Sequence, residues 1–226
     1  YYPTTIKNMR AIITINDHIN SVNSLSESIS KKMNFCIKKI EDTKNINSII
    51  DDIDAAIIIV GIDKGKNIQP YLNSLREVRI PYIFVKPDQE AEIKTILLPV
   101  TNLMEDREKG HFAQSFSRHY NAPIVIYKPN DYGTKAETNI ASIVSLLEKV
   151  NINPTIIQGK KDSLKIENEA TNSADKYESP LIIISASRDY GLDDIFFGPK
   201  ERKNIKHSKY PIMLINPRGD LYSLCD

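Results

Sequence analysis

Apolar residues in this chain gather in short runs that do not alternate with polar ones. Three of these runs share one pattern, at residues 81–87, 123–129 and 211–217: a proline, four apolar or aromatic residues, one polar residue and a second proline. Proline is tolerated at the first residue of a strand and cannot donate a hydrogen bond within it, so the prolines mark strand ends. An unbroken apolar run is typical of a strand that is buried on both faces of a parallel sheet.

Between these runs the apolar spacing becomes helical, as in the stripe Ile140, Ile143 and Leu147. The second half of the chain therefore predicts five strands and four helices in strict alternation. The strands are expected at 95–100, 123–128, 154–158, 181–185 and 211–215, and the helices at 105–119, 134–150, 163–177 and 199–207. Strict alternation predicts a doubly wound parallel sheet with right-handed crossovers.

The first half repeats this order in a shorter form. Strands are expected at 11–15, 35–40, 55–60 and 82–85, and helices near 19–33, 44–52 and 67–78, which is one strand and one helix fewer. A polar segment, 88–92, separates the halves. The fold class predicted is therefore α/β, with two doubly wound, Rossmann-like domains at 1–88 and 92–226, of which the N-terminal one is truncated.

Composition and charge narrow the classes of function. The chain has 30 Lys and Arg against 29 Asp and Glu, a net charge of +1, and no block of one sign, which argues against nucleic acid or an anionic membrane as the main partner. Its 2 cysteines cannot form a disulfide framework or a four-ligand zinc site. The longest aliphatic run, 55–60, is far shorter than the ~20 residues of a membrane helix. A soluble, cytoplasmic protein is the expectation.

The second half resembles the universal stress protein family over nearly all of its length. The resemblance rests on the first strand, 96–102, and on the order of the fourth strand, 180–184, and of Gly191, Gly198 and Pro211 after it. It implies adenine nucleotide alpha hydrolase-like domains, with the first half similar to a worn second copy. It also implies self-association or a pseudo-dimer through the last strand of each half, 81–85 beginning at Pro81 and 211–215 beginning at Pro211.

Members of that family that bind ATP carry G-x2-G-x9-G-[ST] after the fourth strand, because glycines let backbone amides approach the phosphates. Here Ser185 and Arg188 occupy the first two glycine positions, Gly198 is kept, and Pro199 replaces the hydroxyl residue. Thr101 replaces the aspartate of the first strand. By resemblance, the residues around the modified loop are Thr101, Asn102, Ser185, Ser187, Arg188, Gly198 and Lys200. Most of the ligand chemistry of the loop has changed.

Two functions follow from these observations. The leading one is a non-catalytic stress-response or regulatory protein with no cofactor, which acts through protein contacts with a partner that the sequence does not identify. The alternative is a sensor that binds ATP, another adenine nucleotide or another anion at the modified loop, where Arg188, Lys200, Arg202 and Lys203 supply side-chain cations. A third hypothesis is a regulatory domain of a transporter or sensor kinase. No catalytic pattern of serine, histidine, cysteine or paired carboxylates is apparent.

One segment of the first half is similar to a phosphate-binding P-loop. The sequence GIDKGKN, residues 61–67, follows a strand and precedes a helix. A P-loop needs four residues between its glycines and then Lys with a hydroxyl residue, whereas this segment has three and ends in Asn67. A surface turn is the prediction.

Overall fold

The fold was obtained as a computed structural model, which describes residues 9–187 and 200–218. The first half contains β1 (Ala11–Ile15), α1 (Asn20–Met33), β2 (Cys36–Ile40), α2 (Ile46–Asp52), β3 (Ala55–Gly61), α3 (Gln69–Leu75) and β4 (Tyr82–Val85). The second half contains β5 (Thr95–Pro99), η1 (Met104–Glu108), α4 (Lys109–Tyr120), β6 (Ile124–Lys128), α5 (Lys135–Glu148), β7 (Thr155–Gln158), α6 (Ile166–Asn172), η2 (Ala174–Lys176), β8 (Pro180–Ser185), α8 (Lys200–His207) and β9 (Ile212–Ile215). Every strand expected from the sequence is present, and the expected helix 163–177 is divided into α6 and η2.

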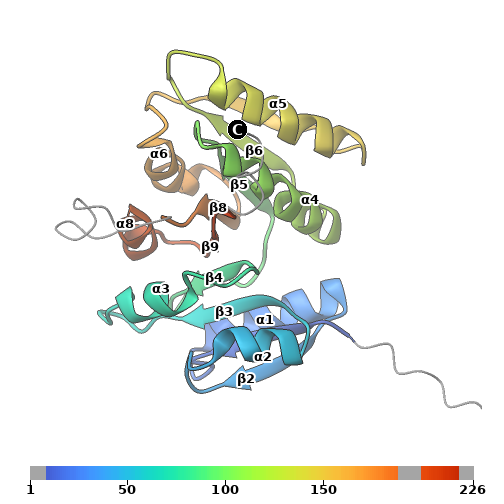
Figure 1. Ribbon diagram of the computed structural model, residues 1–226, viewed down its shortest axis with the longest axis vertical. Helices are drawn as coiled ribbons and strands as arrows, with labels where there is room; N and C mark the ends of the chain where they lie inside the picture. Colours follow the sequence, from blue (N-terminus) through green and yellow to red (C-terminus); the bar gives the residue numbers. More distant parts are fainter. Residues whose placement is uncertain (1–8, 188–199, 219–226) are drawn as a thin grey trace, which may run out of the picture.

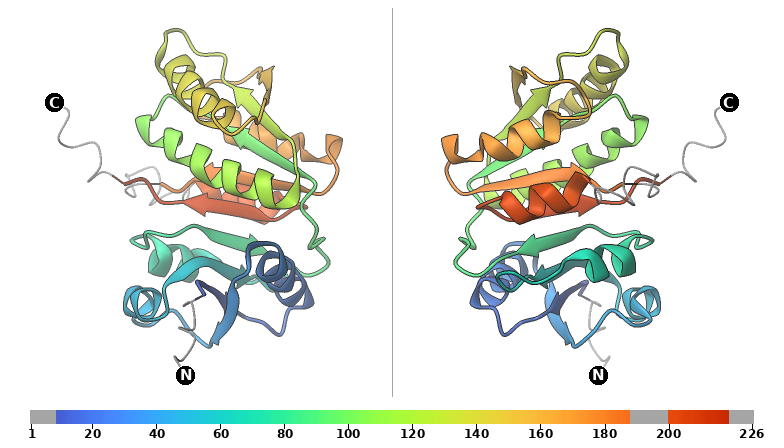
Figure 2. Two further views of the ribbon diagram at one scale, coloured as in Figure 1. Left: turned by 90° about the vertical axis from the view of Figure 1, so that its right-hand side faces the viewer. Right: turned by 90° about the vertical axis from the view of Figure 1, so that its left-hand side faces the viewer.

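The described residues form one nine-stranded sheet in the order β2-β1-β3-β4-β9-β8-β5-β6-β7 (Figure 1). All neighbouring strands are parallel except β4 and β9, which pair antiparallel. Helices cover both faces. Helices α1, α4 and α5 pack on one face, and α2, α3, α6 and α8 pack on the other (Figure 2). The architecture is therefore a Rossmann-like α/β fold.

Burial on both faces explains the apolar runs. In β3, Ile57 and Ile59 pack under α1, whereas Ile58 and Val60 pack under α2 and α3. The prolines also fit this sheet. The carbonyl groups of Pro81, Pro123 and Pro211 accept hydrogen bonds from the amides of neighbouring strands, at 3.1, 2.9 and 3.2 Å. Each proline thus joins the ladder as an acceptor at the strand start, where its missing N–H is not needed.

The two halves correspond strand by strand. The order β2-β1-β3-β4 matches β6-β5-β8-β9, which leaves β7 without a counterpart in the first half. A cap repeats as well. Helices α1 and α4 both end at a left-handed asparagine, Asn34 or Asn121, and Ser30 and Ser117 each bond the carbonyl five residues on, at 2.6 and 2.7 Å. The first half therefore lacks the equivalents of α5 and β7, which the sequence left open. The division into domains 1–88 and 92–226 remains a prediction.

The strands β4 and β9, which begin after Pro81 and Pro211, pair with each other inside one chain. Tyr82, Ile83 and Phe84 lie opposite Leu214, Met213 and Ile212, and all six side chains are buried. Beside them, the Tyr82 hydroxyl donates to Asn216 Oδ1 at 2.9 Å. The Asn216 amide in turn donates to the carbonyls of Leu75 and Val78, at 2.7 and 2.9 Å. Buried side chains and these hydrogen bonds join the halves, and β2 and β7 are the outer strands.

No helix among the described residues is long and apolar enough to cross a membrane.

The pairing of β4 with β9 predicts a sharp contrast between two lysine substitutions on strands. Leu214→Lys places a charge at a fully buried position, so we expect a loss of more than about 4 kcal/mol of unfolding free energy, close to complete unfolding. Ile156→Lys, on the outer strand β7 where the side chain is 48% exposed, should change stability by less than about 0.5 kcal/mol. Urea denaturation measures both, and equal losses would contradict the role of this seam.

Candidate functional site

The candidate site lies where the strand order reverses in the second half. The chain leaves β5 toward α4 on one face, and leaves β8 toward α8 on the other, so the carboxyl ends of β5 and β8 flank a switch point. Open α/β sheets place their ligands at such points. Thr101 and Asn102 follow β5. Ser185 is the last residue of β8, and Ser187 follows that strand. The other expected loop residues, Arg188 and Gly198, lie outside the described residues.

The structure brings Thr101 and Ser185 together through one carboxylate. Asp106 Oδ2 accepts the Thr101 amide at 2.5 Å, and Asp106 Oδ1 accepts the Ser185 hydroxyl at 2.6 Å. Asn102 makes a different contact, because its backbone amide donates to Ser163 Oγ at 3.1 Å. Lys200 begins α8 and is exposed, beside a separate cavity against α6. Among the described residues, the structure therefore brings Thr101 and Ser185 together, whereas Asn102 and Lys200 make separate contacts.

The buried side chain of Lys109, from α4, occupies the switch point. The Lys109 side chain has 0% exposure, and its ammonium group donates to the Pro99 carbonyl at 2.6 Å. It also contacts Asp106 Oδ2 at 2.9 Å and Glu167 Oε1 at 3.4 Å. We call Asp106, Lys109, Glu167 and Ser185 the Lys109 cluster. It holds β5, α4, α6 and β8 together at the point where a ligand would otherwise enter.

Three backbone amides at this edge of the sheet donate to carboxylates of the protein. Besides Thr101 on Asp106, the Ser185 amide donates to Glu167 at 2.9 Å, and the Ser187 amide donates to Glu201 at 3.1 Å. The Ser187 hydroxyl also donates to Glu201, at 2.8 Å. Backbone amides in this position donate hydrogen bonds to phosphate oxygens in nucleotide-binding loops. Internal carboxylates thus take the place of a ligand anion.

Burial changes the acid–base properties of the cluster. Desolvation raises the pKa of the Glu167 carboxyl, and the negative charge of Asp106 acts in the same direction. The Lys109 ammonium and the Ser185 amide oppose this rise. Asp106 and Lys109 have no exposed surface, so these charges act on each other inside the protein, where they are poorly screened by water.

The site residues predicted from the sequence did not include Asp106, Lys109 or Glu167. A signal was present, because Lys109 stands three residues before Phe112 and so continues the stripe Phe112, Phe116 and Tyr120. A lysine at a position with the period of a buried stripe is unusual and calls for a buried partner. The partners themselves, 3 and 58 residues away, could not be read from spacing.

The corresponding place in the first half holds a cavity of about 410 Å³, which is lined by Asn16, Gly61 and Tyr71. Asn16, at φ 59°, follows β1. Its side-chain amide donates to the Gly61 carbonyl and to the Tyr71 hydroxyl, both at 2.7 Å. Gly61 is required by packing, since a Cβ there would lie 2.8 Å from atoms of both Ile19 and Val22. This glycine therefore allows α1 to approach β3 closely and is not evidence of a ligand.

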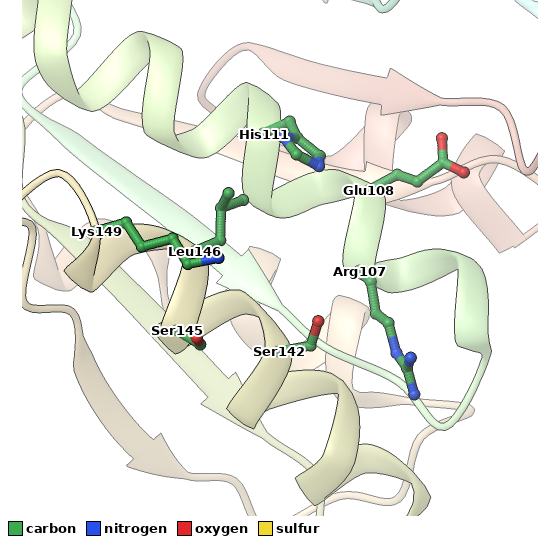
Figure 3. Close-up of a pocket in the computed structure, with 7 residues that line it drawn as sticks. All are labelled: Arg107, Glu108, His111, Ser142, Ser145, Leu146 and Lys149. Atoms are coloured by element: carbon green, nitrogen blue, oxygen red, sulfur yellow. The ribbon is translucent and has the colours of Figure 1, made fainter.

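A hollow of about 280 Å³ lies between α4 and α5 (Figure 3). His111 lines it from α4, and Ser142 and Ser145 line it from α5. Within the described part of the chain, His111 makes no hydrogen bond to either serine, and Arg107 is engaged by Asn139 Oδ1 at 2.9 Å. The hollow holds no histidine-activated serine. Among the described residues, no group of three or more His, Cys, Asp or Glu side chains is placed to hold a metal ion.

Comparison with known proteins gives a likeness in structure only. No family model and no curated protein matches the sequence. A universal stress protein from Archaeoglobus fulgidus DSM 4304 matches with a TM-score of 0.60 and 13% identity, covering 94% of this chain and 88% of its own. A putative universal stress protein from Pseudomonas aeruginosa UCBPP-PA14 matches at 0.57 and 10%, covering 98% of both chains. A functionally unknown protein from P. aeruginosa PAO1 matches at 0.56 and 12%, covering 96% and 85%. The chain has the fold of universal stress proteins.

Removing the lysine of the cluster should be strongly destabilising. In Lys109→Met the carboxylates of Asp106 and Glu167 lose their buried cation, so we expect a loss of about 3–5 kcal/mol of unfolding free energy at pH 7. The control is Lys209→Met, which breaks the exposed pair of Lys209 with Asp175 and should leave the free energy of unfolding nearly unchanged. Urea denaturation compares the two variants. A cost below 1 kcal/mol for Lys109→Met would contradict the role of the cluster.

The raised pKa of Glu167 predicts a specific dependence on pH. The folded state holds the Glu167 proton at pH values where the unfolded state, with a pKa near 4.5, has released it. The free energy of unfolding should therefore fall as the pH rises from 4.5 through the raised pKa, and this fall should be missing in Glu167→Gln. Unfolding curves of both proteins between pH 4 and 8 measure the difference. A difference that grows in favour of the wild type with rising pH would contradict the assignment.

Proposed function

We propose that this chain is a universal-stress-protein-like regulatory protein of the cytoplasm, which acts through protein contacts and without catalysis. In this proposal it does not bind ATP through the loop after β8. The fold, shared with universal stress proteins, supports the class of protein but not the activity. The contacts at the switch point support the lack of ATP binding and of catalysis in this proposal.

The observation that carries the proposal is the occupation of the loop amides. Thr101, Ser185 and Ser187 donate their amides to Asp106, Glu167 and Glu201 at 2.5–3.1 Å. A phosphate group in the same place would have to displace these carboxylates and approach their negative charge. Each displaced carboxylate would lose charge-assisted hydrogen bonds, worth about 1.5–3 kcal/mol apiece. Nucleotide binding at this loop is therefore opposed by the protein itself.

Within the described residues, the burial of the Lys109 cluster at the same place supports a non-catalytic role. Lys109 is the basic group of the Lys109 cluster, but it is buried and shared between two carboxylates. Such an ammonium is neither a free nucleophile nor an accessible general acid.

Protein contacts of the chain would use surfaces outside the central seam. β4 and β9 each have a neighbouring strand on both sides, so a second copy or another protein cannot add to them. The pairing inside one chain supports the pseudo-dimer form of association. The partner protein that the proposal requires would bind elsewhere, on the helices or on the outer strands β2 and β7.

One observation favours the alternative, a sensor of nucleotides or other anions. Lys200, Arg202 and Lys203 of α8 line a cavity of about 620 Å³ between α6 and α8. None of these three side chains forms a salt bridge within residues 9–187 and 200–218. The sequence predicts that these three cations form an anion site together with Arg188.

Thermal unfolding with and without millimolar ATP, ADP or AMP tests the proposal, with Arg188→Ala as the matched variant. A ligand at 100 times its dissociation constant adds about 2.7 kcal/mol, which raises the unfolding midpoint of a chain this long by about 5–10 °C. We expect wild type and Arg188→Ala to respond identically to each nucleotide. A rise in midpoint that Arg188→Ala abolishes would replace the proposal by the sensor.

A further inference from the structure

A further cavity lies where the two halves meet, on the face covered by α3 and α8. It measures about 490 Å³ and is lined by the turn 62–68 after β3, by Lys86 after β4, and by Arg202, Ile205 and Lys206 of α8. We call it the seam pocket. Its volume falls within the range of about 300–1,000 Å³ that is usual for small-molecule sites. Neither half could form this pocket alone.

The charges that line the seam pocket are almost all positive. They are Lys64, Lys66, Lys86, Arg202 and Lys206, against the single carboxylate of Asp63. Asp63 is already engaged by His18, at 3.2 Å. Within the described residues, none of the five cations forms a salt bridge. In a chain of net charge +1, this concentration of unpaired cations in one concave place attracts anions.

Lys86 shows that one of these cations is held in place rather than free in solvent. Its ammonium group donates to the Lys206 carbonyl, at the C-terminal end of α8, at 3.1 Å. Partial burial lowers the pKa of Lys86, so its charged form is incompletely solvated. An anion in the pocket would supply the missing stabilisation.

The turn after β3 gives the pocket an accessible backbone. The turn is closed by the Lys66 amide, which donates to the Asp63 carbonyl at 3.0 Å. Gly65 has a φ of +80°, and no atom lies within 4 Å of the place where a Cβ would stand. The backbone of Gly65 is therefore open to close approach. Behind it, the buried side chains of Ile62, Ile68 and Ile205 form a fixed apolar wall.

We propose that the seam pocket binds a small molecule with two or more linked phosphate groups. Arginine offers a planar fork to phosphate oxygens, and lysine offers a compact charge, so a mixed set suits a chain of phosphates better than a single carboxylate. The size of the pocket limits the ligand to a compact molecule. The site is separate from the Lys109 cluster and does not depend on the proposed function.

A neighbouring cavity supplies the matched controls. The cavity between α6 and α8 shares Arg202 and Lys206 with the seam pocket, but Lys165 and Lys203 line only that cavity. Lys64 and Lys66 line only the seam pocket among these two. Lys31 and Lys38 lie in α1 and β2, away from both cavities. All six lysines are exposed, so their replacement by glutamine should leave the fold intact.

Calorimetric titration with inorganic tripolyphosphate tests the proposal. We expect saturable binding by the wild type, weakened at least about tenfold in Lys64→Gln with Lys66→Gln, since two charge-assisted contacts are lost. The double variants Lys165→Gln with Lys203→Gln and Lys31→Gln with Lys38→Gln remove the same charge and should change affinity by less than about threefold. The thermal unfolding midpoint of each variant checks that it is folded.

Three outcomes would overturn the proposal. They are no saturable binding by the wild type, an equal or larger loss in the Lys165 and Lys203 variant, and an equal loss in the Lys31 and Lys38 variant, which would reflect net charge alone. A response to ATP that Arg188→Ala keeps, but that the Lys64 and Lys66 variant loses, belongs to the seam pocket. Such a response supports this inference and leaves the proposed function unchanged.

Discussion

The antiparallel contact between β4 and β9 determines the arrangement of the whole molecule, because it joins two short parallel sheets into one. Ile83 opposite Met213 lies at its centre, and Asn216 closes the end of the contact by bonding Tyr82 and the carbonyls of Leu75 and Val78. A first half of four strands has a small core of its own. Fused to the second half, it shares two continuous hydrophobic layers that run under the helices of both halves.

The same contact sets the chemistry of the two ends of the sheet. Since the halves run in opposite directions, the carboxyl ends of β3 and β4 meet the C-terminal end of α8, and Lys86 reaches the Lys206 carbonyl there. At the opposite end of the sheet, the carboxyl ends of β5 and β8 are closed by Asp106, Lys109 and Glu167. One end is thus filled by paired charges, while the other collects unpaired cations around a cavity.

Much of the fold could be predicted because its signals are local. The paired prolines, the unbroken run in β3 and the stripe Ile140, Ile143 and Leu147 gave strands and helices within a few residues of their observed bounds. The loop after β8 could be recognised as changed from Ser185 and Pro199 alone. The site was harder. Lys109 stood out of place on an apolar stripe, but Glu167 is 58 residues away, and Asp106 is 79 residues from Ser185.

The sequence by itself determined which segments become strands and helices, and that the loop after β8 lacks two of the three glycines of the ATP-binding pattern, since periodicity and backbone chemistry belong to short stretches of chain. Only the tertiary structure decided that β4 pairs with β9, that carboxylates occupy the amides of Thr101, Ser185 and Ser187, and that cations from both halves converge on one pocket. These features depend on which distant residues are brought within a few ångströms. Hydrogen bonds and ion pairs act only at that range, and no local pattern in the sequence encodes it.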